Sequence, residues 1–123
     1  MALQTESSGI NKGYQMSQEG FLEGAIDYYA QGLRIDNMKF ELLFNLGWIY
    51  NTMNRWSVAL HWMAKAHITN PDEVRPLYGL AVITLKLAQY RESLDLTLQA
   101  SSMKIDDEIM KINLLYLTAV INK

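Results

Sequence analysis

Apolar residues recur along most of the chain at the three- and four-residue spacing of amphipathic helices. A polar pair at 54–55 interrupts one such pattern, which then resumes over residues 56–68. The apolar positions before this break are Leu42, Leu43, Leu46, Ile49 and Tyr50. Two amphipathic stretches separated by a short polar turn are typical of a helical hairpin, so the pattern predicts one between about residues 40 and 68.

The segment "TNPDE" at residues 69–73 predicts the end of this hairpin and the start of another. Pro71 has no backbone N–H and blocks helix propagation. Asp72 and Glu73 suit the first turn of a following helix, because the helix dipole favours negative charge at its N-terminus. A second helical unit is therefore expected from about residue 74.

The whole arrangement repeats with a period of 34 residues. Small residues keep the period in three series, which are Ala25, Ala59 and Ser93, then Gly32, Ala66 and Ala100, then Gly13, Gly47 and Ala81. Larger residues keep it too, as in Leu22, Trp56 and Tyr90. Small side chains at fixed places let two antiparallel helices approach closely. We expect a larger residue at Gly47 or Ala59 to destabilise the fold through overpacking.

The 34-residue helix–turn–helix period, with these small residues, resembles the tetratricopeptide repeat. The middle unit carries the signature at Leu43, Leu46, Gly47, Tyr50, Ala59, Met63, Ala66 and Pro71. It departs from the family at Met63, where an aromatic residue is usual, and at Asn54, where glycine is usual.

The flanking units match the family pattern less completely. The third matches at Leu77, Leu80, Ala81, Tyr90 and Ala100, and departs at Thr84, Ser93, Thr97 and Ile105. The first matches in its second helix, at Gly20, Ala25, Tyr29, Gly32 and Asn37. Its first helix has only Gly13 on the pattern and is expected to be short. The resemblance covers residues 8 to 105.

The resemblance implies an all-α fold, a right-handed superhelix of three helix–turn–helix repeats plus one terminal helix. We expect a flexible N-terminus at residues 1–7 and a single domain over 8–123. Within it, the repeats are expected at about 6–39, 40–73 and 74–107, with the terminal helix at about 107–121. Asp106, Asp107 and Glu108 suit the start of that helix.

The predicted terminal helix is apolar nearly all round, unlike a solvated cap with a polar outer face. Its apolar residues are Leu114, Leu115, Tyr116, Leu117, Val120 and Ile121. One interpretation is a cap buried against the third repeat. The other is that its outer face meets another chain or a further repeat, with Leu114, Leu117 and Ile121 as the candidate interface.

In the family, the first helix of each repeat lines a concave groove, which the resemblance assigns to partner binding. Of the three tryptophans, Trp48 lies on a first helix and is the candidate for a partner contact, the alternative being packing against the next unit. Trp56 and Trp62 lie on a second helix and are expected to be core or convex residues. The predicted groove residues are Asn11, Tyr14, Phe44, Asn45, Trp48, Asn51, Arg75, Tyr78, Val82, Lys86 and Tyr116, with Gln18 and Glu41 beside them.

Some members of the family grip the C-terminal carboxylate of cytosolic chaperones with a clamp of lysine, asparagine and arginine side chains. At the clamp positions this chain has Ile10 and Tyr14 in the first unit, Asn45 in the second, and Arg75 and Gly79 in the third. A carboxylate needs several converging donors. With only Asn45 and Arg75 suited to the role, this use of the groove is disfavoured.

Composition excludes several other classes of function. The chain has 123 residues, a net charge of −2 with scattered basic residues, and no cysteine, so it is not expected to bind nucleic acid or hold a thiolate metal centre. No signal or membrane-spanning segment is evident, and a cytoplasmic location is the default expectation. His61 and His67 lie six residues apart, which does not suit a metal pair on one helix face. No enzymatic activity, cofactor or metal is expected.

The sequence thus favours an interaction module or adaptor whose groove binds a partner peptide or helix. Two alternatives remain open at this stage. The chain is a structural subunit that packs into a homo-oligomer or larger complex through its apolar terminal helix, or it is a small chaperone that shields a segment of a client protein.

Overall fold

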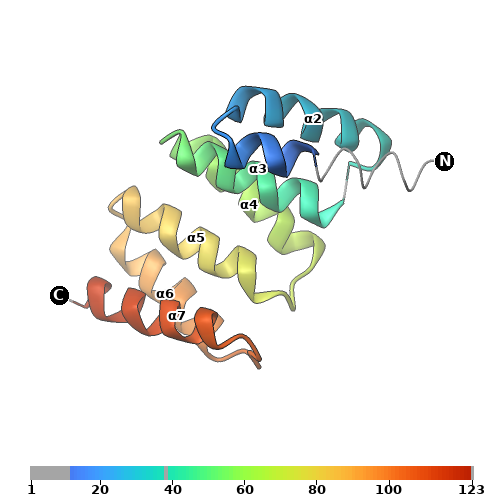
Figure 1. Ribbon diagram of the computed structural model, residues 1–123. Helices are drawn as coiled ribbons and strands as arrows, with labels where there is room; N and C mark the ends of the chain where they lie inside the picture. Colours follow the sequence, from blue (N-terminus) through green and yellow to red (C-terminus); the bar gives the residue numbers. More distant parts are fainter. Residues whose placement is uncertain (1–11, 38, 123) are drawn as a thin grey trace.

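The computed structural model in Figure 1 describes residues 12–37 and 39–122, which form only helices and connecting turns. Residues 12–18 are helical and precede α2 (Leu22–Ile35), α3 (Phe40–Thr52), α4 (Trp56–Thr69), α5 (Val74–Lys86), α6 (Tyr90–Ser101) and α7 (Glu108–Ile121). The predicted class, an all-α stack of helical hairpins with a terminal helix, is confirmed. None of the helices in the described ranges is long and apolar enough to cross a membrane. The predicted N-terminus at 1–7 and Asn11 lie outside the described residues.

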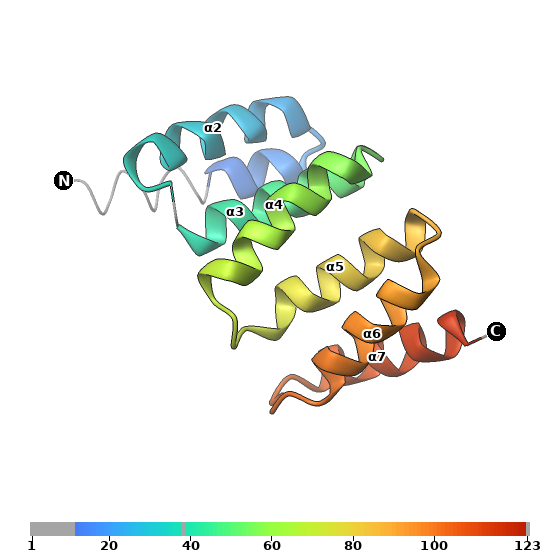
Figure 2. The same ribbon diagram turned by 180° about the vertical axis from the view of Figure 1, so that it is seen from behind.

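The hairpins stack along one direction, from helix 12–18 and α2 at one end to α7 at the other (Figure 1). Within a hairpin the two helices pack against each other, as α3 does with α4 and α5 with α6. Helix α4 lies behind α3 in Figure 1 and in front of it in Figure 2. Helix α3 also contacts α5, and α5 contacts α7. The first helices of successive hairpins therefore form one continuous layer.

The turn inside each hairpin has the same geometry in all three repeats. Its central residue has a left-handed backbone, with φ of 88° at Gly20, 60° at Asn54 and 61° at Ala88. In the middle repeat, Asn54 N–H donates to Asn51 C=O and Arg55 N–H donates to Tyr50 C=O. Equivalent pairs recur at 34-residue intervals on either side. This is a Schellman motif, which satisfies the free carbonyls at a helix C-terminus.

Met63 fills the junction of α3, α4 and α5, and it explains two of the small residues. Its side chain is fully buried. A Cβ added at Gly47 or at Gly79 would approach Met63 Cε to 2.7 Å in either case, closer than real contacts allow. The flexible thioether thus occupies the space that the two glycines leave, where the family usually has an aromatic ring.

The polar residues that depart from the family pattern in the third repeat are buried but hydrogen-bonded. Ser93 Oγ donates to Ala81 C=O of the facing helix over 2.7 Å. Thr84 Oγ1 donates to Leu80 C=O, and Thr97 Oγ1 donates to Ser93 C=O. Since a buried hydroxyl is costly only when it lacks a partner, these substitutions are compatible with the same helix packing.

Helix α7 begins where the acidic run predicts, and Asp107 is its N-cap. The carboxylate of Asp107 accepts hydrogen bonds from the backbone N–H groups of Ile109 and Met110. One face of α7 is buried against α5 and α6 through Met110, Leu114 and Leu117.

The opposite face of α7 is apolar and exposed. It carries Ile109, Ile112, Leu115 and Tyr116, all with more than half of their surface accessible. This corrects the candidate end-helix interface, because Leu114 and Leu117 are core residues, at 2% and 5% exposure, and Ile121 is half-buried. The sequence pattern could not separate the two faces, since both are apolar.

Candidate functional site

A pocket of about 430 Å³ lies between helix 12–18, α2 and α3. Its lining comprises Tyr14, Ser17, Gln18, Leu22, Tyr29, Phe44, Asn45, Trp48, Ile49 and Thr52. Every one of these side chains is aromatic, aliphatic, hydroxyl or amide, and no carboxylate, ammonium or guanidinium is among them. Such a lining suits apolar groups together with hydrogen-bonding groups of neutral character.

Tyr29 and Asn45 connect the first and second repeats at this pocket. Tyr29 is 1% exposed, and Asn45 lies with it in the pocket lining. Burial raises the pKa of the Tyr29 phenol to about 12, although the Asn45 side chain acts in the opposite direction. The phenol is therefore neutral at physiological pH.

A series of four aromatic rings runs from α3 to α5. Phe40 and Phe44 are stacked with ring centroids 5.8 Å apart, and Phe44 meets Trp48 edge to face at 6.1 Å. Trp48 in turn lies 6.1 Å from Tyr78 of α5, with the two ring planes tilted by 52°. Phe44 is almost entirely covered, whereas Trp48 and Tyr78 keep part of their surface exposed. The series places a partly exposed indole on a rigid aromatic support.

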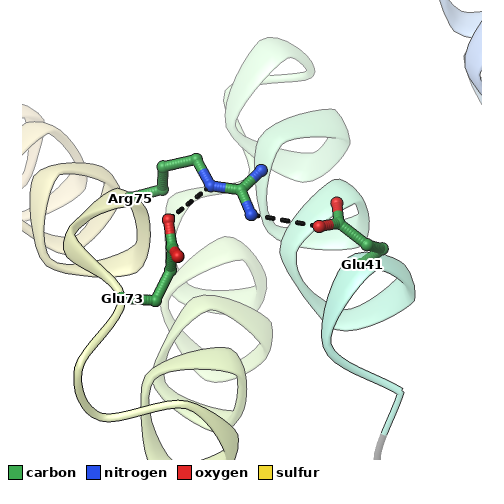
Figure 3. Close-up of polar contacts among 3 residues, drawn as sticks. All are labelled: Glu41, Glu73 and Arg75. Carbon is green, nitrogen blue, oxygen red and sulfur yellow. Dashed lines mark hydrogen bonds and ion pairs between the residues drawn. The ribbon is translucent and has the colours of Figure 1, made fainter. Parts of the chain in front are cut away.

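Arg75 covers the start of this aromatic series and joins α3 to the loop before α5. Its guanidinium carbon lies 5.2 Å from the Phe40 centroid and 5.0 Å from the Phe44 centroid, within range of a cation–π interaction. Its Nε donates to Glu73 over 2.6 Å and its Nη2 donates to Glu41 over 3.0 Å (Figure 3). Burial acts to lower the pKa of Arg75, but the two carboxylates outweigh it and the pKa is raised.

A second polar contact joins the other ends of α3 and α5. Lys86 Nζ donates to Asn51 Oδ1 over 3.0 Å. Asn51 is buried and Lys86 is exposed. Together with the Arg75 contacts, this pair fixes the two first helices beside each other at both ends.

The predicted groove residues in the described part of the chain lie on helix 12–18, α3, α5 and α7. Tyr14, Phe44, Asn45 and Trp48 line the pocket, while Asn51, Arg75, Tyr78 and Lys86 form the contacts between α3 and α5. Val82 is half-buried on α5. Tyr116 lies on α7, one 34-residue period after Val82, and Ile112 stands in the same relation to Tyr78. Phe44 and Asn51 are 9% and 6% exposed, so these two predicted groove residues are largely covered, whereas Tyr116 is 71% exposed.

Several lining residues were absent from the sequence prediction. Ser17, Leu22, Tyr29, Ile49 and Thr52 line the pocket, and Phe40 and Glu73 hold Arg75. Ser17 and Thr52 lie one helical turn from predicted residues Tyr14 and Trp48, so extending the helical spacing by one turn would have found them. Tyr29 carries no such signal, since its position in the repeat is that of a core residue.

The described part of the chain contains no group of three His, Asp or Glu side chains that could hold a metal ion. His61 instead packs edge to face on Trp62, with ring centroids 5.2 Å apart. These two residues belong to α4, away from the lining of the pocket.

Comparison with known proteins identifies the fold. No protein-family model matches the sequence, and no curated protein matches it. Solved structures do match. The Yersinia enterocolitica type III secretion chaperone SycD, in complex with a peptide of the translocator YopD, aligns with a TM-score of 0.89 at 16% identity. The alignment covers 97% of this chain and 93% of SycD.

Two further structures extend the comparison. PcrH from Pseudomonas aeruginosa, in complex with the chaperone-binding region of PopD, gives a TM-score of 0.91 at 14% identity, over 99% of this chain and 94% of PcrH. The second TPR domain of human RPAP3, in complex with the HSP70 peptide SGPTIEEVD, gives a TM-score of 0.86 at 15% identity, over 100% of this chain and 99% of that domain. The chain has the tetratricopeptide repeat fold. Among proteins with this fold, its structure is similar to those of SycD, PcrH and the second TPR domain of RPAP3.

Proposed function

We propose that the protein is a non-enzymatic interaction module that binds a peptide or helix of a partner protein in its concave groove. The observation that carries the proposal is Trp48, a partly exposed indole at the edge of the 430 Å³ pocket. A large aromatic side chain at a pocket is the kind of residue that supplies most of the energy of a protein interface.

The surroundings of Trp48 favour tight binding because they hold the ring in place. Phe44 supports one edge of the indole and Tyr78 packs against it from the next repeat. Little side-chain entropy is then lost when a ligand packs on it. Gln18 and Asn45, which line the same pocket, are suited to hydrogen-bond a ligand backbone and fix its register.

The structural neighbours support this use of the groove. SycD and PcrH have this fold at 16% and 14% identity and are seen with a peptide of the translocator YopD and with the chaperone-binding region of PopD, and the RPAP3 domain is seen with an HSP70 peptide. The remaining predicted groove residues, including Val82, Lys86 and Tyr116, are proposed to contact the same partner beyond the pocket.

The proposal is tested by selecting binders from a display library of random 12-residue peptides and measuring their affinity by fluorescence polarisation. We expect Trp48→Ala to raise the Kd of the selected peptides by about tenfold or more, which is the effect of removing an interface hot spot. Tyr90→Ala is the matched control, because Tyr90 is an exposed aromatic residue at the start of α6 and lies outside the pocket lining. Equal affinities for the wild type and Trp48→Ala would reject the groove as the binding site.

A second candidate function is that of a chaperone that shields an apolar segment of a client. The similarity to SycD and PcrH over nearly the whole of each chain favours it. A chaperone would keep a co-expressed client soluble, whereas an adaptor would join two proteins that are each soluble alone. Solubility of a client with and without this chain distinguishes the two functions.

Assembly through α7 is the third proposal, and the exposed Ile109, Ile112, Leu115 and Tyr116 favour it. Light scattering on size-exclusion eluate, at two concentrations about tenfold apart, tests it by mass action. A constant mass near 14.1 kDa contradicts self-association, and a larger mass supports it.

A further inference from the structure

We propose that Glu41 and Glu73 make this groove selective against acidic ligands, so that the segment it binds places an uncharged, apolar or aromatic anchor beside Trp48. The inference rests on the proposed peptide-binding function and names the chemistry of its ligand. It is carried by the contacts of Arg75, by the charge of the surrounding side chains and by the uncharged lining of the pocket.

Arg75 is the cation beside the aromatic series, and it is already paired with two carboxylates. Its Nε and Nη2 donate to Glu73 and Glu41 (Figure 3), while its guanidinium carbon lies 5.2 Å from the Phe40 ring centroid and 5.0 Å from that of Phe44. One positive and two negative groups leave this trio with a net charge of −1. A carboxylate that approached Phe44 from this side would therefore meet net repulsion rather than attraction.

Among the residues that the structure describes, none of those lining the pocket is a cation. These described lining side chains are all uncharged, and a carboxylate that leaves water without a cationic partner loses favourable solvation. The other basic residue that joins α3 and α5 is Lys86, which lies at the last turn of α5, whereas Arg75 lies at the first. Neutral side chains carry no such cost and bury apolar surface against Trp48.

The trio that joins α3 and α5 is also accessible to an incoming ligand. The side chains of Arg75, Glu41 and Glu73 are 39%, 46% and 33% exposed. Ion pairs this accessible usually contribute little to folding. They nevertheless determine the electrostatic potential that an incoming ligand meets at the edge of the groove.

The peptides SGPTIEEVD and SRMEEVD, seen with the two TPR domains of RPAP3-type proteins, are suitable acidic probes. Each carries several carboxylates. Fluorescence polarisation compares them with a display-selected uncharged peptide on the wild type and on the double variant Glu41→Gln/Glu73→Gln. The control variant Glu23→Gln/Glu92→Gln changes the net charge equally, and its glutamates lie in the first turns of α2 and α6, as Glu41 does in α3.

We expect both acidic peptides to bind the wild type at least about tenfold more weakly than the uncharged peptide does. In Glu41→Gln/Glu73→Gln, the affinity for the acidic peptides should rise about tenfold, and the affinity for the uncharged peptide should not change. The gain should shrink in high salt because the pairs are exposed. Tight binding of either acidic peptide to the wild type, or an equal gain in the control variant, would overturn the inference.

Failure of the proposed function gives a different result. In that case Trp48→Ala leaves the affinity of the uncharged peptide unchanged, whatever the acidic peptides do. Thermal unfolding of each glutamine variant verifies that it folds. If the trio serves only to stabilise the fold, Glu41→Gln/Glu73→Gln will have a lower melting temperature, but the ratio of its affinities for acidic and uncharged peptides will equal that of the wild type.

Discussion

The indole of Trp48 packs against the phenol ring of Tyr78 across the boundary between two repeats, with centroids 6.1 Å apart. Burial raises the pKa of Tyr78, which agrees with a ring that is partly withdrawn from water. The sequence left two interpretations of Trp48, a partner contact or packing against the next unit. The geometry joins the two, because the packing against Tyr78 is what holds the remaining face of the indole at the pocket.

This ring contact should contribute to the stability of the stack. In a double-mutant cycle with Trp48→Ala and Tyr78→Ala, we expect a coupling energy of about 0.5–1.5 kcal/mol, typical of aromatic pairs at this distance. The measurement is urea unfolding of the wild type, both single variants and the double variant. Tyr90→Ala paired with Trp48→Ala serves as the control and should be additive. A coupling energy of zero for the first pair would contradict a packed contact.

Ala88 is under backbone strain that glycine would relieve. Its φ of 61° lies in the left-handed region, where an L-residue other than glycine is disfavoured by roughly 1–2 kcal/mol. The equivalent residue of the first repeat is Gly20, with a φ of 88°. We therefore expect Ala88→Gly to raise the free energy of unfolding by up to about 1 kcal/mol, after the entropy gained by the unfolded chain is subtracted.

The matched control for that substitution is Ala119→Gly, on the exposed side of α7 in ordinary helical conformation. It should lower stability by about 1 kcal/mol, since glycine is a poor helix former. Chemical denaturation compares both variants with the wild type. Destabilisation by Ala88→Gly as large as that of Ala119→Gly would mean that the turn does not hold Ala88 in the left-handed region.

Tyr29 makes stability depend on pH at the alkaline end. Its folded pKa of about 12 lies above the value of 10.0 for an unperturbed tyrosine. The folded state thus favours the neutral phenol, and the associated stability is fully present below pH 10 and is lost as the pH rises towards 12. Urea unfolding midpoints are measured at pH 9 and at pH 11. Between these two values we expect the midpoint of the wild type to fall more than that of Tyr29→Phe, whose side chain cannot ionise. Parallel losses in both proteins would show that Tyr29 does not contribute.

Substitution of Asp107 and of its neighbour Asp106 measures how much the N-cap of α7 contributes to stability. Asp107 accepts two backbone hydrogen bonds, whereas Asp106 is exposed and has no such role in the described structure. Asp107→Ala should cost about 1 kcal/mol of stability, and Asp106→Ala should cost markedly less. Hydrogen exchange should show faster opening of residues 108–121 in Asp107→Ala alone. Equal effects of the two substitutions would indicate a general charge effect at the helix N-terminus rather than capping.

Much of the fold could be predicted from the sequence because its determinants are local and periodic. The turn at Asn54 and the acidic start of α7 act within a few residues, and the 34-residue period makes the small residues at Gly47 and Ala81 recognisable. The substitution of Met63 for an aromatic residue could be seen as a departure but not explained. Its explanation is the space left by Gly47 and Gly79, which belong to two different helices.

The candidate site could be predicted only in part, because its chemistry depends on contacts between repeats. The register of α3 pointed to Phe44, Asn45 and Trp48, and all three line the pocket. Nothing local to Arg75 shows that Glu41, 34 residues earlier, neutralises it together with Glu73. Whether a basic side chain is available to a ligand depends on such pairing, which the spacing of residue types along the chain does not reveal.

The last prediction concerns the two faces of α7. It tests whether Leu114 belongs to the core while Leu115 belongs to the exposed face. Leu114 is 2% exposed in a core cluster with Leu77, Ala100 and Met110, whereas its neighbour Leu115 is 72% exposed. Leu114→Ala should therefore destabilise the protein by about 2–5 kcal/mol through the lost contacts and the cavity left behind. Leu115→Ala should change stability by no more than about 0.5 kcal/mol, as surface substitutions usually do. Urea unfolding at two protein concentrations about tenfold apart measures both, and light scattering at the higher concentration reports any change of mass. A large stability loss on Leu115→Ala that grows with protein concentration would show instead that this face is buried in an assembly, because only association couples stability to concentration.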